Sequence, residues 1–406
     1  MCGLAGFYPS QNASHDASQQ LIHNMVDTLN HRGPDDSGIW VDSNQLIALG
    51  HRRLSILDIS SAGHQPMSLE KGRFVLTYNG EIYNHLKIRA QIEKDNDPIQ
   101  WIGNSDTETL LAAFEIWGIE KTLPKLRGMF AIAVWDKKFK KLSLIRDRFG
   151  EKPLYYGWVK SEKKTFFSFG SELKALACIP DFKNDISKLA LKEYFKYMYV
   201  PCPLSIYDHI FKLEPGCILQ IDGEAPCNPP SYSMHSSSNK THRYESLSLY
   251  RWYDLKNIVE DEVELFKDEH EATHEIESEL KKVINLQSIS DVPLGAFLSG
   301  GVDSSTIVSL MQQENNRPVK TFTIGFEDSS YDESKFASDV ATHLGTDHSE
   351  LTVTAKDALS IVPRLPDFYD EPFADSSQIP TYFVCKSAKQ DVTVALSGDA
   401  GDELFG

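Results

Sequence analysis

The stretch Phe297-Leu298-Ser299-Gly300-Gly301-Val302-Asp303-Ser304-Ser305 follows an apolar run and opens a run with helical spacing. Its two glycines let backbone N–H groups approach an anion closely, its serines add hydroxyl donors, and the start of a helix adds positive charge. The glycine-lysine pair of a Walker A loop is missing, which excludes that motif. The stretch therefore predicts an anion-binding turn between a strand and a helix, in preference to a glycine-rich connection without a ligand.

Strand-like and helical runs alternate on either side of this turn. Apolar runs occupy 294–298, 321–326 and 393–396, and helical runs begin at Ser304 and cover 333–344. This alternation is typical of βαβ units. It predicts an α/β domain with a parallel sheet, in which ligands bind beyond the carboxyl ends of the strands.

A second glycine-rich loop follows the last of these strand-like runs. It contains Ser397, Gly398, Asp399 and Asp402. Carboxylates at the end of a parallel strand suit Mg²⁺ or a bound intermediate, whereas those of an ordinary loop are simply solvated. Because such a strand needs a following helix to cover the sheet, we expect the chain to be a C-terminally truncated fragment.

Residues 1–200 have a different pattern. Helical spacing occurs over 21–29 and 107–117. The strand-like runs of this half are short: 39–41, 46–49, 74–78, 129–135 and 142–146. This mixture predicts an α+β domain with antiparallel sheets.

The middle of the chain separates these two patterns. Residues 223–250 are rich in serine, proline and asparagine, which predicts a surface loop or linker. The acidic run 260–279 is typical of the solvated face of a helix rather than of a metal site. We therefore expect a first domain over 1–205, a linker and polar loop region over 206–259, and a partial second domain over 260–406.

Composition narrows the possible functions. The chain has 406 residues, enough for two or three domains, and a net charge of −17 from 41 basic and 58 acidic residues. The acidic excess lies in the second half and argues against nucleic-acid binding. No apolar run approaches the ~18 residues of a membrane span, and the N-terminus lacks a secretory signal, so we expect a cytoplasmic protein without membrane contact. The 6 cysteines form no CxxC pair and are interpreted as reduced thiols.

Cys2 stands apart from the other cysteines by its position. It directly follows Met1 and precedes the small residues Gly3 and Ala5. Removal of the methionine would place the thiol beside a free α-amine, whose ordinary pKa is about 8 and which can act as its base. Any residue can follow an initiator methionine, so Cys2 alone is weak evidence of a nucleophile.

Three later segments carry polar groups suited to a small substrate. Arg52 and Arg53 end a strand-like run with paired guanidinium groups that suit a carboxylate. Asn79 and Gly80, at an expected strand end, can point an amide and a backbone N–H at one oxyanion, although Asn-Gly is also a common hairpin turn. The polar residues that begin at Ser105 are typical of a helix cap.

Five segments in this order resemble the glutaminase domain of class II glutamine amidotransferases. They are Met1-Cys2-Gly3, His31-Arg32-Gly33-Pro34-Asp35, Arg53-Leu54-Ser55-Ile56, Tyr78-Asn79-Gly80-Glu81-Ile82-Tyr83-Asn84 and Ser105-Asp106. The resemblance implies a four-layered αββα fold of the N-terminal-nucleophile type, with the loop of Arg32 as a mobile lid. It also implies that Cys2 attacks the glutamine amide to give a thioester and ammonia, while Asn79 and Gly80 form the oxyanion hole. The implied glutamine-binding residues are Arg53, which would hold the α-carboxylate, Leu54, Ser55, Ile56, Leu57, Asn79, Gly80, Glu81 and Asp106.

The second half resembles ATP pyrophosphatases, which split ATP into AMP and pyrophosphate while they adenylate a substrate. With both halves on one chain, the sequence resembles the glutamine-hydrolysing asparagine synthetase family over essentially its whole length. The resemblance departs from the family pattern at Ala400, where glycine is usual, and in the long polar segment 223–250. Asp303 and Asp399 are implied to bind Mg²⁺, and Asp399 to take part in forming the intermediate. The implied ATP-binding residues are Leu298, Ser299, Gly300, Gly301, Asp303, Ser304, Ile324, Ser397 and Gly398.

The resemblance implies three substrates: L-glutamine, L-aspartate and ATP. Aspartate would be activated as β-aspartyl-AMP, and ammonia would reach it through an internal channel. Another acceptor carboxylate, such as a sugar acid or a peptide, is an alternative, since the residues 370–377 that are expected to line the acceptor pocket do not reveal its selectivity. A β-lactam synthetase is disfavoured because such relatives lack the cysteine, and a non-catalytic binding protein is disfavoured by Cys2, Asn79, Asp303 and Asp399. A homodimer is one assembly that the resemblance allows.

Overall fold

The computed structural model describes residues 1–9, 14–44, 46–95, 99–162, 165–230, 240–260, 265–327 and 332–405. The chain folds into two compact units. Unit 1 is Met1–Val263 with Asp370–Phe373, and unit 2 is Glu264–Tyr369 with Ala374–Gly406. None of the described helices is long and apolar enough to cross a membrane.

Unit 1 contains two six-stranded sheets with antiparallel pairing throughout. The first sheet has the order β2 (Asp36–Val41), β3 (Ala48–Arg53), β1 (Gly3–Phe7), β8 (Thr165–Gly170), β7 (Tyr155–Lys160) and β9 (Ile210–Lys212). The second has the order β11 (His242–Tyr244), β12 (Leu247–Arg251), β10 (Cys217–Asp222), β6 (Lys141–Arg146), β5 (Gly128–Asp136) and β4 (Phe74–Ile82). The predicted antiparallel sheets are therefore present.

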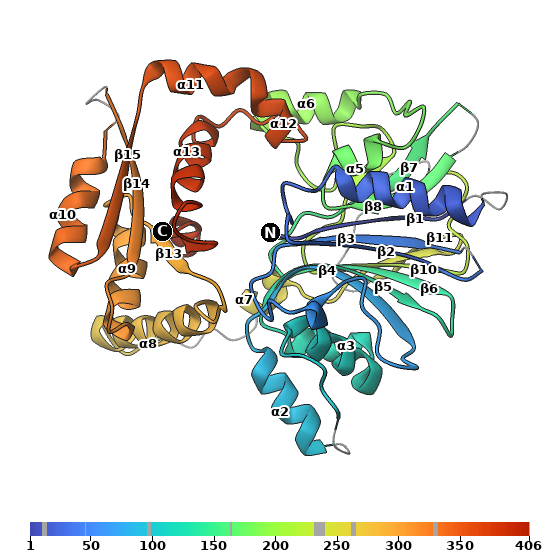
Figure 1. The fold of residues 1–406 in the computed structure, drawn as a ribbon, viewed down its shortest axis with the longest axis horizontal. Helices are drawn as coiled ribbons and strands as arrows, with labels where there is room; N and C mark the ends of the chain where they lie inside the picture. The colour runs from blue at the N-terminus through green and yellow to red at the C-terminus, as the bar shows by residue number, and fades with distance from the viewer. Residues whose placement is uncertain are drawn as a thin grey trace. The chain divides into compact units, whose positions relative to one another are not determined.

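Apolar faces decide how these sheets and helices stack. Side chains of both sheets, among them Leu49 and Trp135, form one core between the sheets. Helix α1 (His15–Asp27) buries Ile22 against the outer face of the first sheet, while α2 (His85–Asp95) and α3 (Asp106–Trp117) pack on the outer face of the second. Figure 1 shows these four layers, which confirm the expected αββα fold.

Helices α1 and α3 begin at serine residues that cap them. The Ser14 hydroxyl accepts a hydrogen bond from the Ala17 N–H, and the Ser105 hydroxyl accepts one from the Glu108 N–H at 3.2 Å. Each bond satisfies a backbone donor that the first helical turn leaves free. The predicted cap at Ser105 is thus confirmed, and it fixes the start of α3 next to the end of β4.

Two local expectations are wrong. Asn79 and Gly80 lie inside β4, where they pair with Ala131 and Phe130, so they form neither a strand end nor a hairpin turn. Part of the expected linker is sheet, since β9 to β12 all fall within 206–259. The polar composition of this region hides an alternation in which Leu247 and its second neighbour Leu249 are buried. Residues 231–239 of the predicted loop lie outside the described residues.

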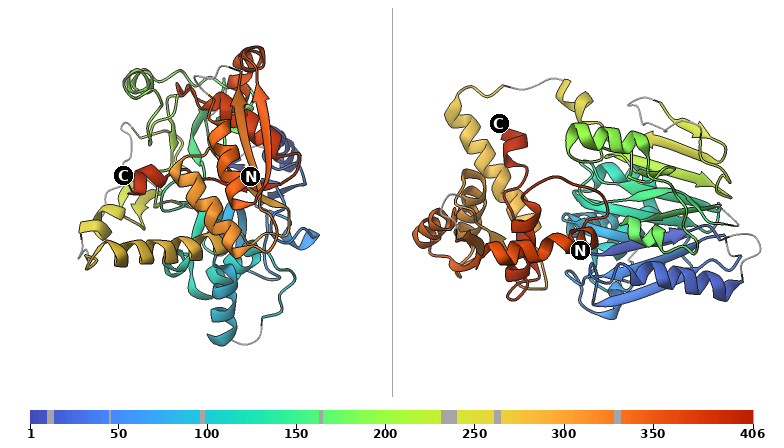
Figure 2. Two further views of the ribbon diagram at one scale, coloured as in Figure 1. Left: turned by 90° about the vertical axis from the view of Figure 1, so that its left-hand side faces the viewer. Right: turned by 90° about the horizontal axis from the view of Figure 1, so that it is seen from above.

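Unit 2 contains the predicted parallel sheet. Its order is β15 (Asp347–Val353), β14 (Lys320–Phe326), β13 (Leu294–Phe297) and β16 (Val394–Leu396). Helices α8 (Glu269–Gln287), α9 (Val302–Glu314) and α10 (Ser334–Leu344) share one apolar core with β13, and α13 (Gln378–Ala388) packs against β14. Figure 2 shows α8 alongside α9 from two further sides. The shorter helices of the chain are α4 (Ile119–Thr122), α5 (Leu173–Ala177), α6 (Lys188–Tyr197), α7 (Leu255–Glu260), α11 (Ala355–Ile361), α12 (Leu365–Phe368) and α14 (Gly401–Phe405).

Candidate active site

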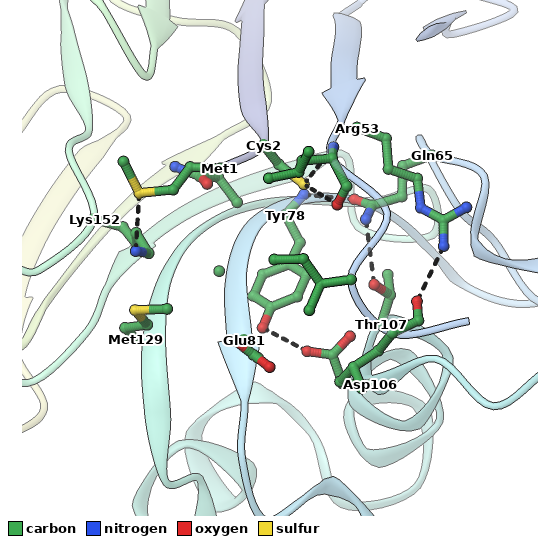
Figure 3. Close-up of a pocket in the computed structure, with 15 residues that line it drawn as sticks. Met1, Cys2, Arg53, Gln65, Tyr78, Glu81, Asp106, Thr107, Met129 and Lys152 are labelled. Carbon is green, nitrogen blue, oxygen red and sulfur yellow. Dashed lines mark hydrogen bonds between the residues drawn. The ribbon is translucent and has the colours of Figure 1, made fainter. Parts of the chain in front are cut away.

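Cys2 directly precedes strand β1, and its thiol contacts Leu54, the residue that follows the neighbouring strand β3. The Leu54 N–H donates to Cys2 Sγ at 3.4 Å, and Sγ donates to the Leu54 carbonyl at 3.6 Å. These contacts follow from the register of the two strands, which pairs Gly3 with Arg52. Figure 3 shows the thiol at the edge of a pocket. The pocket is lined by Met1, Cys2, Arg53, Leu54, Ile56, Leu57, Gln65, Tyr78, Asn79, Gly80, Glu81, Asp106, Thr107, Met129 and Lys152.

The Cys2 thiol needs a base before it can act as a nucleophile. Burial raises its pKa above the ordinary value for cysteine. The thiolate, not the thiol, is the attacking species. Cys2 is preceded here by Met1, whose Sδ lies 3.1 Å from Lys152 Nζ. An α-amine on Cys2 itself would lie within the same residue as the thiol and can supply the base.

Asn79 presents an unused amide to the pocket. The residue is only 1% exposed, and neither its Nδ2 nor its Oδ1 has a hydrogen-bond partner among the described residues. A buried polar group without a partner is costly and normally awaits a ligand or water. The next residue must be glycine, because a Cβ on Gly80 would lie 2.2 Å from the Met129 carbonyl oxygen. The pair thus places a free amide donor and a closely packed backbone beside Cys2.

Acidic groups line the other side of the pocket. Asp106 Oδ2 accepts hydrogen bonds from the Tyr78 hydroxyl at 2.8 Å and from the Ile82 N–H at 2.9 Å. Burial raises the pKa of Asp106. Burial, together with the nearby Asp106, raises the pKa of Glu81 to about 7, and Lys152 acts in the opposite direction. Two desolvated carboxyl groups at one end of a pocket suit an ammonium group.

A buried polar framework holds this pocket in shape. The Gln65 side chain accepts from the Tyr78 N–H at 2.8 Å and donates to the Thr107 hydroxyl at 3.2 Å. His51 Nε2 lies 2.9 Å from the Tyr78 carbonyl, and burial lowers the pKa of His51 to about 4. This histidine is therefore a neutral structural donor rather than a catalytic base at neutral pH.

The two predicted guanidinium groups do not act as a pair. Successive strand residues point to opposite faces, so Arg52 turns to Asp27 and the Val26 carbonyl. Arg53 lines the pocket, but its guanidinium also donates to the carbonyls of Leu57, Asp58 and Ser60. It therefore holds the loop 57–60 in place beside the pocket.

The structure brings most of the predicted glutamine-site residues together, with one exception. Ser55 does not line the pocket, and its N–H donates instead to Asp35 at 2.8 Å. Sequence reasoning gave no role to the pocket residues Gln65, Tyr78, Thr107, Met129 and Lys152. Of these, only Tyr78 and Thr107 had a signal that could have found them, because they directly adjoin the predicted Asn79 and Asp106.

A second pocket lies in unit 2 at the carboxyl ends of the parallel strands. Gly300 and Gly301 are not among its lining residues, although Gly300 has the positive φ of +83° that the turn requires. Aromatic side chains and residues of α13 also line this pocket, and the sequence patterns did not predict them. The pocket is lined by Phe297, Leu298, Ser299, Asp303, Ser304, Phe322, Thr323, Ile324, Phe326, Glu333, Pro380, Thr381, Val384, Ser397, Gly398 and Asp399.

Short-range hydrogen bonds shape the turn at the mouth of this second pocket. The Ser299 and Ser304 hydroxyls are 2.9 Å apart, and the Gly301 N–H donates to the Ser299 hydroxyl. The loop at Gly398 packs closely on the start of α9, since a Cβ there would lie 2.6 Å from the Ser304 nitrogen. Ser397 donates to Asp399 Oδ2 at 3.1 Å. The turn and the second glycine-rich loop therefore form one surface.

Two carboxylates of this pocket fit a magnesium ion that is bound with a phosphate. Asp303 and Asp399 both line it, and Mg²⁺ prefers one or two carboxylates together with phosphate oxygens and water. Among the residues that the structure describes, no group of three or more His, Cys, Asp or Glu side chains is arranged around a metal position. Asp402 does not line the pocket and is exposed on α14.

Matches to two protein-family models agree with the division of the chain into two units. The family model described as a glutamine amidotransferase domain matches residues 1–231, and the model described as asparagine synthase matches residues 275–406. A solved structure of glutamine phosphoribosylpyrophosphate amidotransferase from Bacillus subtilis has a TM-score of 0.41 and 16% identity, and covers 86% of this chain and 65% of that chain.

Two curated relatives extend over the whole chain. Asparagine synthetase (glutamine-hydrolysing) 1 of Bacillus subtilis is 35% identical over 407 residues, which is 100% of this chain and 58% of the relative. A protein of Methanocaldococcus jannaschii that carries the name asparagine synthetase (glutamine-hydrolysing) 2 is 34% identical over 426 residues, which is 100% of this chain and 75% of the relative. The chain thus spans little more than half of the first relative's length. With two matching domains in the same order, this chain belongs to the glutamine-hydrolysing asparagine synthetase family.

Proposed function

We propose that unit 1 hydrolyses the side-chain amide of glutamine, with Cys2 as the nucleophile. One observation carries this proposal: the thiol shares a pocket with the unpartnered amide of Asn79, and the acidic residues Glu81 and Asp106 line that same pocket. An electrophilic amide at one end of the substrate and an α-ammonium group at the other match this arrangement. Arg53 would bind the α-carboxylate.

The reaction begins after removal of Met1. The α-amine of Cys2 takes the thiol proton, and Sγ forms a bond to the amide carbon of glutamine. The oxyanion that develops accepts hydrogen bonds from Asn79 Nδ2 and the Gly80 N–H, which are donors that need no rearrangement at that moment. The carbon–nitrogen bond then breaks, and the amine returns its proton to the leaving nitrogen, which departs as ammonia. Water hydrolyses the thioester to glutamate and regenerates Cys2.

For the whole protein, we propose that unit 2 contributes to the synthesis of asparagine from aspartate, ATP and this ammonia. Activation is needed because a free carboxylate has no good leaving group. Formation of β-aspartyl-AMP releases pyrophosphate, and attack by ammonia then releases AMP and a proton. Backbone and hydroxyl donors of the turn from Ser299 to Ser304 would hold the pyrophosphate, with Ile324 near the base, and Asp303 and Asp399 would hold Mg²⁺. The bound Mg²⁺ would neutralise phosphate charge.

The glutaminase reaction is tested on the 406-residue chain, with and without Met1. We expect the chain with Met1 removed to release ammonia and glutamate in equal amounts from glutamine, and a chain that retains Met1 to be inactive. Equal activity of the two forms would overturn the role of the α-amine.

The acceptor is tested on the full-length protein. ATP–pyrophosphate exchange would be measured with aspartate, with a sugar acid and with a peptide carboxylate. We expect exchange with aspartate. Exchange with another acid alone would assign a different acceptor, and exchange with none would favour a binding protein over a ligase.

A further inference from the structure

Arg32 ties the backbone of Cys2 to a carboxylate far along the chain. Its Nε donates to the Cys2 carbonyl oxygen at 2.8 Å, and its Nη1 donates to Glu172 Oε1 at 2.7 Å. The two side chains are only 9% and 10% exposed. Because the guanidinium is a planar fork, the position of the carboxylate fixes the direction in which Nε points. Arg32, the expected lid residue, therefore has a largely buried side chain that connects the Cys2 backbone with Glu172.

Glu172 is held in place from several sides. Besides Arg32, His31 Nε2 lies 3.0 Å from its Oε2, and Lys174 Nζ lies 2.9 Å from the same oxygen. Burial by itself raises the pKa of this carboxyl, but the bonds from His31, Arg32 and Lys174 outweigh it and lower the pKa to about 2. The carboxylate is thus charged at any physiological pH and has little freedom to move.

Ser171, the residue before Glu172, forms hydrogen bonds with the same end of β1. The Leu4 N–H donates to the Ser171 hydroxyl at 3.0 Å, and the Ser171 N–H donates to the Leu4 carbonyl at 2.9 Å. Ser171 is fully buried. The two residues that follow β8 therefore hold the chain on both sides of Gly3, directly through Leu4 and through Arg32 at Cys2.

Such support matters because the nucleophile would be the first residue of the processed chain. Without Met1, no preceding residue constrains Cys2, and the contacts at Leu54 hold only its thiol. A displacement of about 1 Å in a reacting group can reduce a rate about 10²-fold. We infer that Glu172 is a positioning residue for the glutaminase reaction: it orients Arg32, which fixes the carbonyl of Cys2. This inference rests on the proposed glutaminase function.

The test is Glu172→Gln, which keeps the size of the side chain and removes its charge. We expect kcat for glutamine hydrolysis to fall about 10²-fold and KM to change less than about 3-fold, because the variant loses alignment rather than binding. Covalent labelling of Cys2 by a diazoketone analogue of glutamine should slow by a similar factor. Labelling of Cys2 by iodoacetamide, which needs only an accessible thiol, should change less than about 3-fold.

A matched control is Glu162→Gln, since Glu162 forms a 2.7 Å ion pair with Lys183 that is exposed and does not contact Cys2. We expect this variant to behave like the wild type. A second variant, Arg32→Lys, keeps a positive charge for Glu172 but loses the planar fork, and should also lower kcat. The double variant should be no slower than the worse single variant, because both changes break one link. If Glu172→Gln fails to fold, Arg32→Lys decides the question.

The possible outcomes separate the two proposals. If the wild type neither hydrolyses glutamine nor reacts with the analogue, the proposed function fails, and this inference fails with it. If the wild type is active and both variants keep their kcat, only the positioning role is overturned. If Glu172→Gln slowed the labelling of Cys2 by the analogue and by iodoacetamide equally, the positioning role would also be overturned, since equal slowing indicates a general loss of structure.

Discussion

The two pockets of this chain are built in different ways. In unit 1, Arg53, Asn79, Glu81 and Asp106 are at most 7% exposed, and the hydrogen bonds of Asp106 to Tyr78 and Ile82 join segments more than 20 residues apart. In unit 2, Ser299 and Asp399 are exposed, and the hydrogen bonds of their loops span only a few residues. A buried pocket built from distant segments is rigid before its substrate binds, whereas an exposed turn offers donors to a ligand that brings its own charge.

This difference follows from the chemistry that each region supports. Attack by a thiol depends on alignment and on donors in a site of low dielectric constant. Holding a pyrophosphate depends mainly on backbone N–H groups and a cation. Substitutions of the nucleophile and of the oxyanion donors in unit 1 should therefore change kcat, and substitutions in the turn of unit 2 should change binding.

The largest effect should come from Cys2→Ala, which removes the proposed nucleophile of unit 1 and leaves unit 2 unchanged. We expect glutamine hydrolysis to fall at least ~10⁴-fold, because the reaction loses its nucleophile. In the full-length protein, ATP–pyrophosphate exchange and synthesis from added ammonia should stay at the wild-type level. Ammonia release and exchange would be measured on the same preparation.

Cys227→Ala is the matched control, since Cys227 is an exposed free cysteine of unit 1. It should leave both activities unchanged. Equal loss of both activities in Cys2→Ala would contradict the assignment of two separate sites.

The next prediction tests the two proposed oxyanion donors, the Asn79 side chain and the Gly80 N–H. Asn79→Ala should lower kcat for glutamine hydrolysis by about 10²–10³-fold with little change in KM, as expected for the loss of one oxyanion donor. Asn24→Ala, at an exposed position of α1, serves as the control. A raised KM with an unchanged kcat would mean that Asn79 binds the ground state and not the oxyanion.

A third effect concerns the pH dependence of glutamine binding. With the pKa of Glu81 raised to about 7, the carboxylate that attracts the α-ammonium is lost as the pH falls below 7. KM for glutamine should rise about tenfold for each pH unit below that value. Glu81→Gln should have a high KM that does not vary over this range. A wild-type KM that is constant between pH 5 and 8 would exclude this role.

The same residue gives a signed prediction for stability. The pKa of Glu81 in the folded protein, about 7, lies above its ordinary value of 4.5, so the folded state binds this proton more tightly than the unfolded state does. Its contribution to stability therefore decreases as the pH rises from 4.5 to 7 and is lowest above 7. Relative to the wild type, Glu81→Gln should gain at most roughly 3 kcal/mol between pH 5 and pH 8 in urea unfolding. If the stability of Glu81→Gln relative to the wild type fell between pH 5 and pH 8, that result would contradict this prediction.

Much of the fold could be predicted because its signals are local. The apolar run that became β5, the cap at Ser105 and the alternation after residue 290 all depend on neighbouring residues. Strand β15 was not predicted, since most of its side chains are polar and only Val353 is buried. Strand β12 was obscured by the polar residues around it.

The candidate site was predicted only where its residues lie in short motifs. Nothing local links Glu172 with Arg32, or Lys152 with Met1, because strand register and packing bring them together. The two arginines after His51 look equivalent in the sequence, and only the alternation of the strand separates their roles. Long-range pairing is therefore the part of a site that a single sequence does not reveal.

The smallest predicted effect concerns the backbone conformation of the second glycine-rich loop of unit 2. Ala400 has a φ of +72°, in the left-handed region, which explains why glycine suits this position. Its side chain is exposed, so its removal costs no packing. The strain of about 1–2 kcal/mol on a non-glycine residue exceeds the entropy that glycine loses, so Ala400→Gly should stabilise unit 2 by about 0.5–1 kcal/mol. Ala272→Gly, inside α8, should instead destabilise it by about 1 kcal/mol. Urea unfolding would compare the two, and destabilisation by both variants would show that the exposed loop of unit 2 tolerates the left-handed alanine without strain.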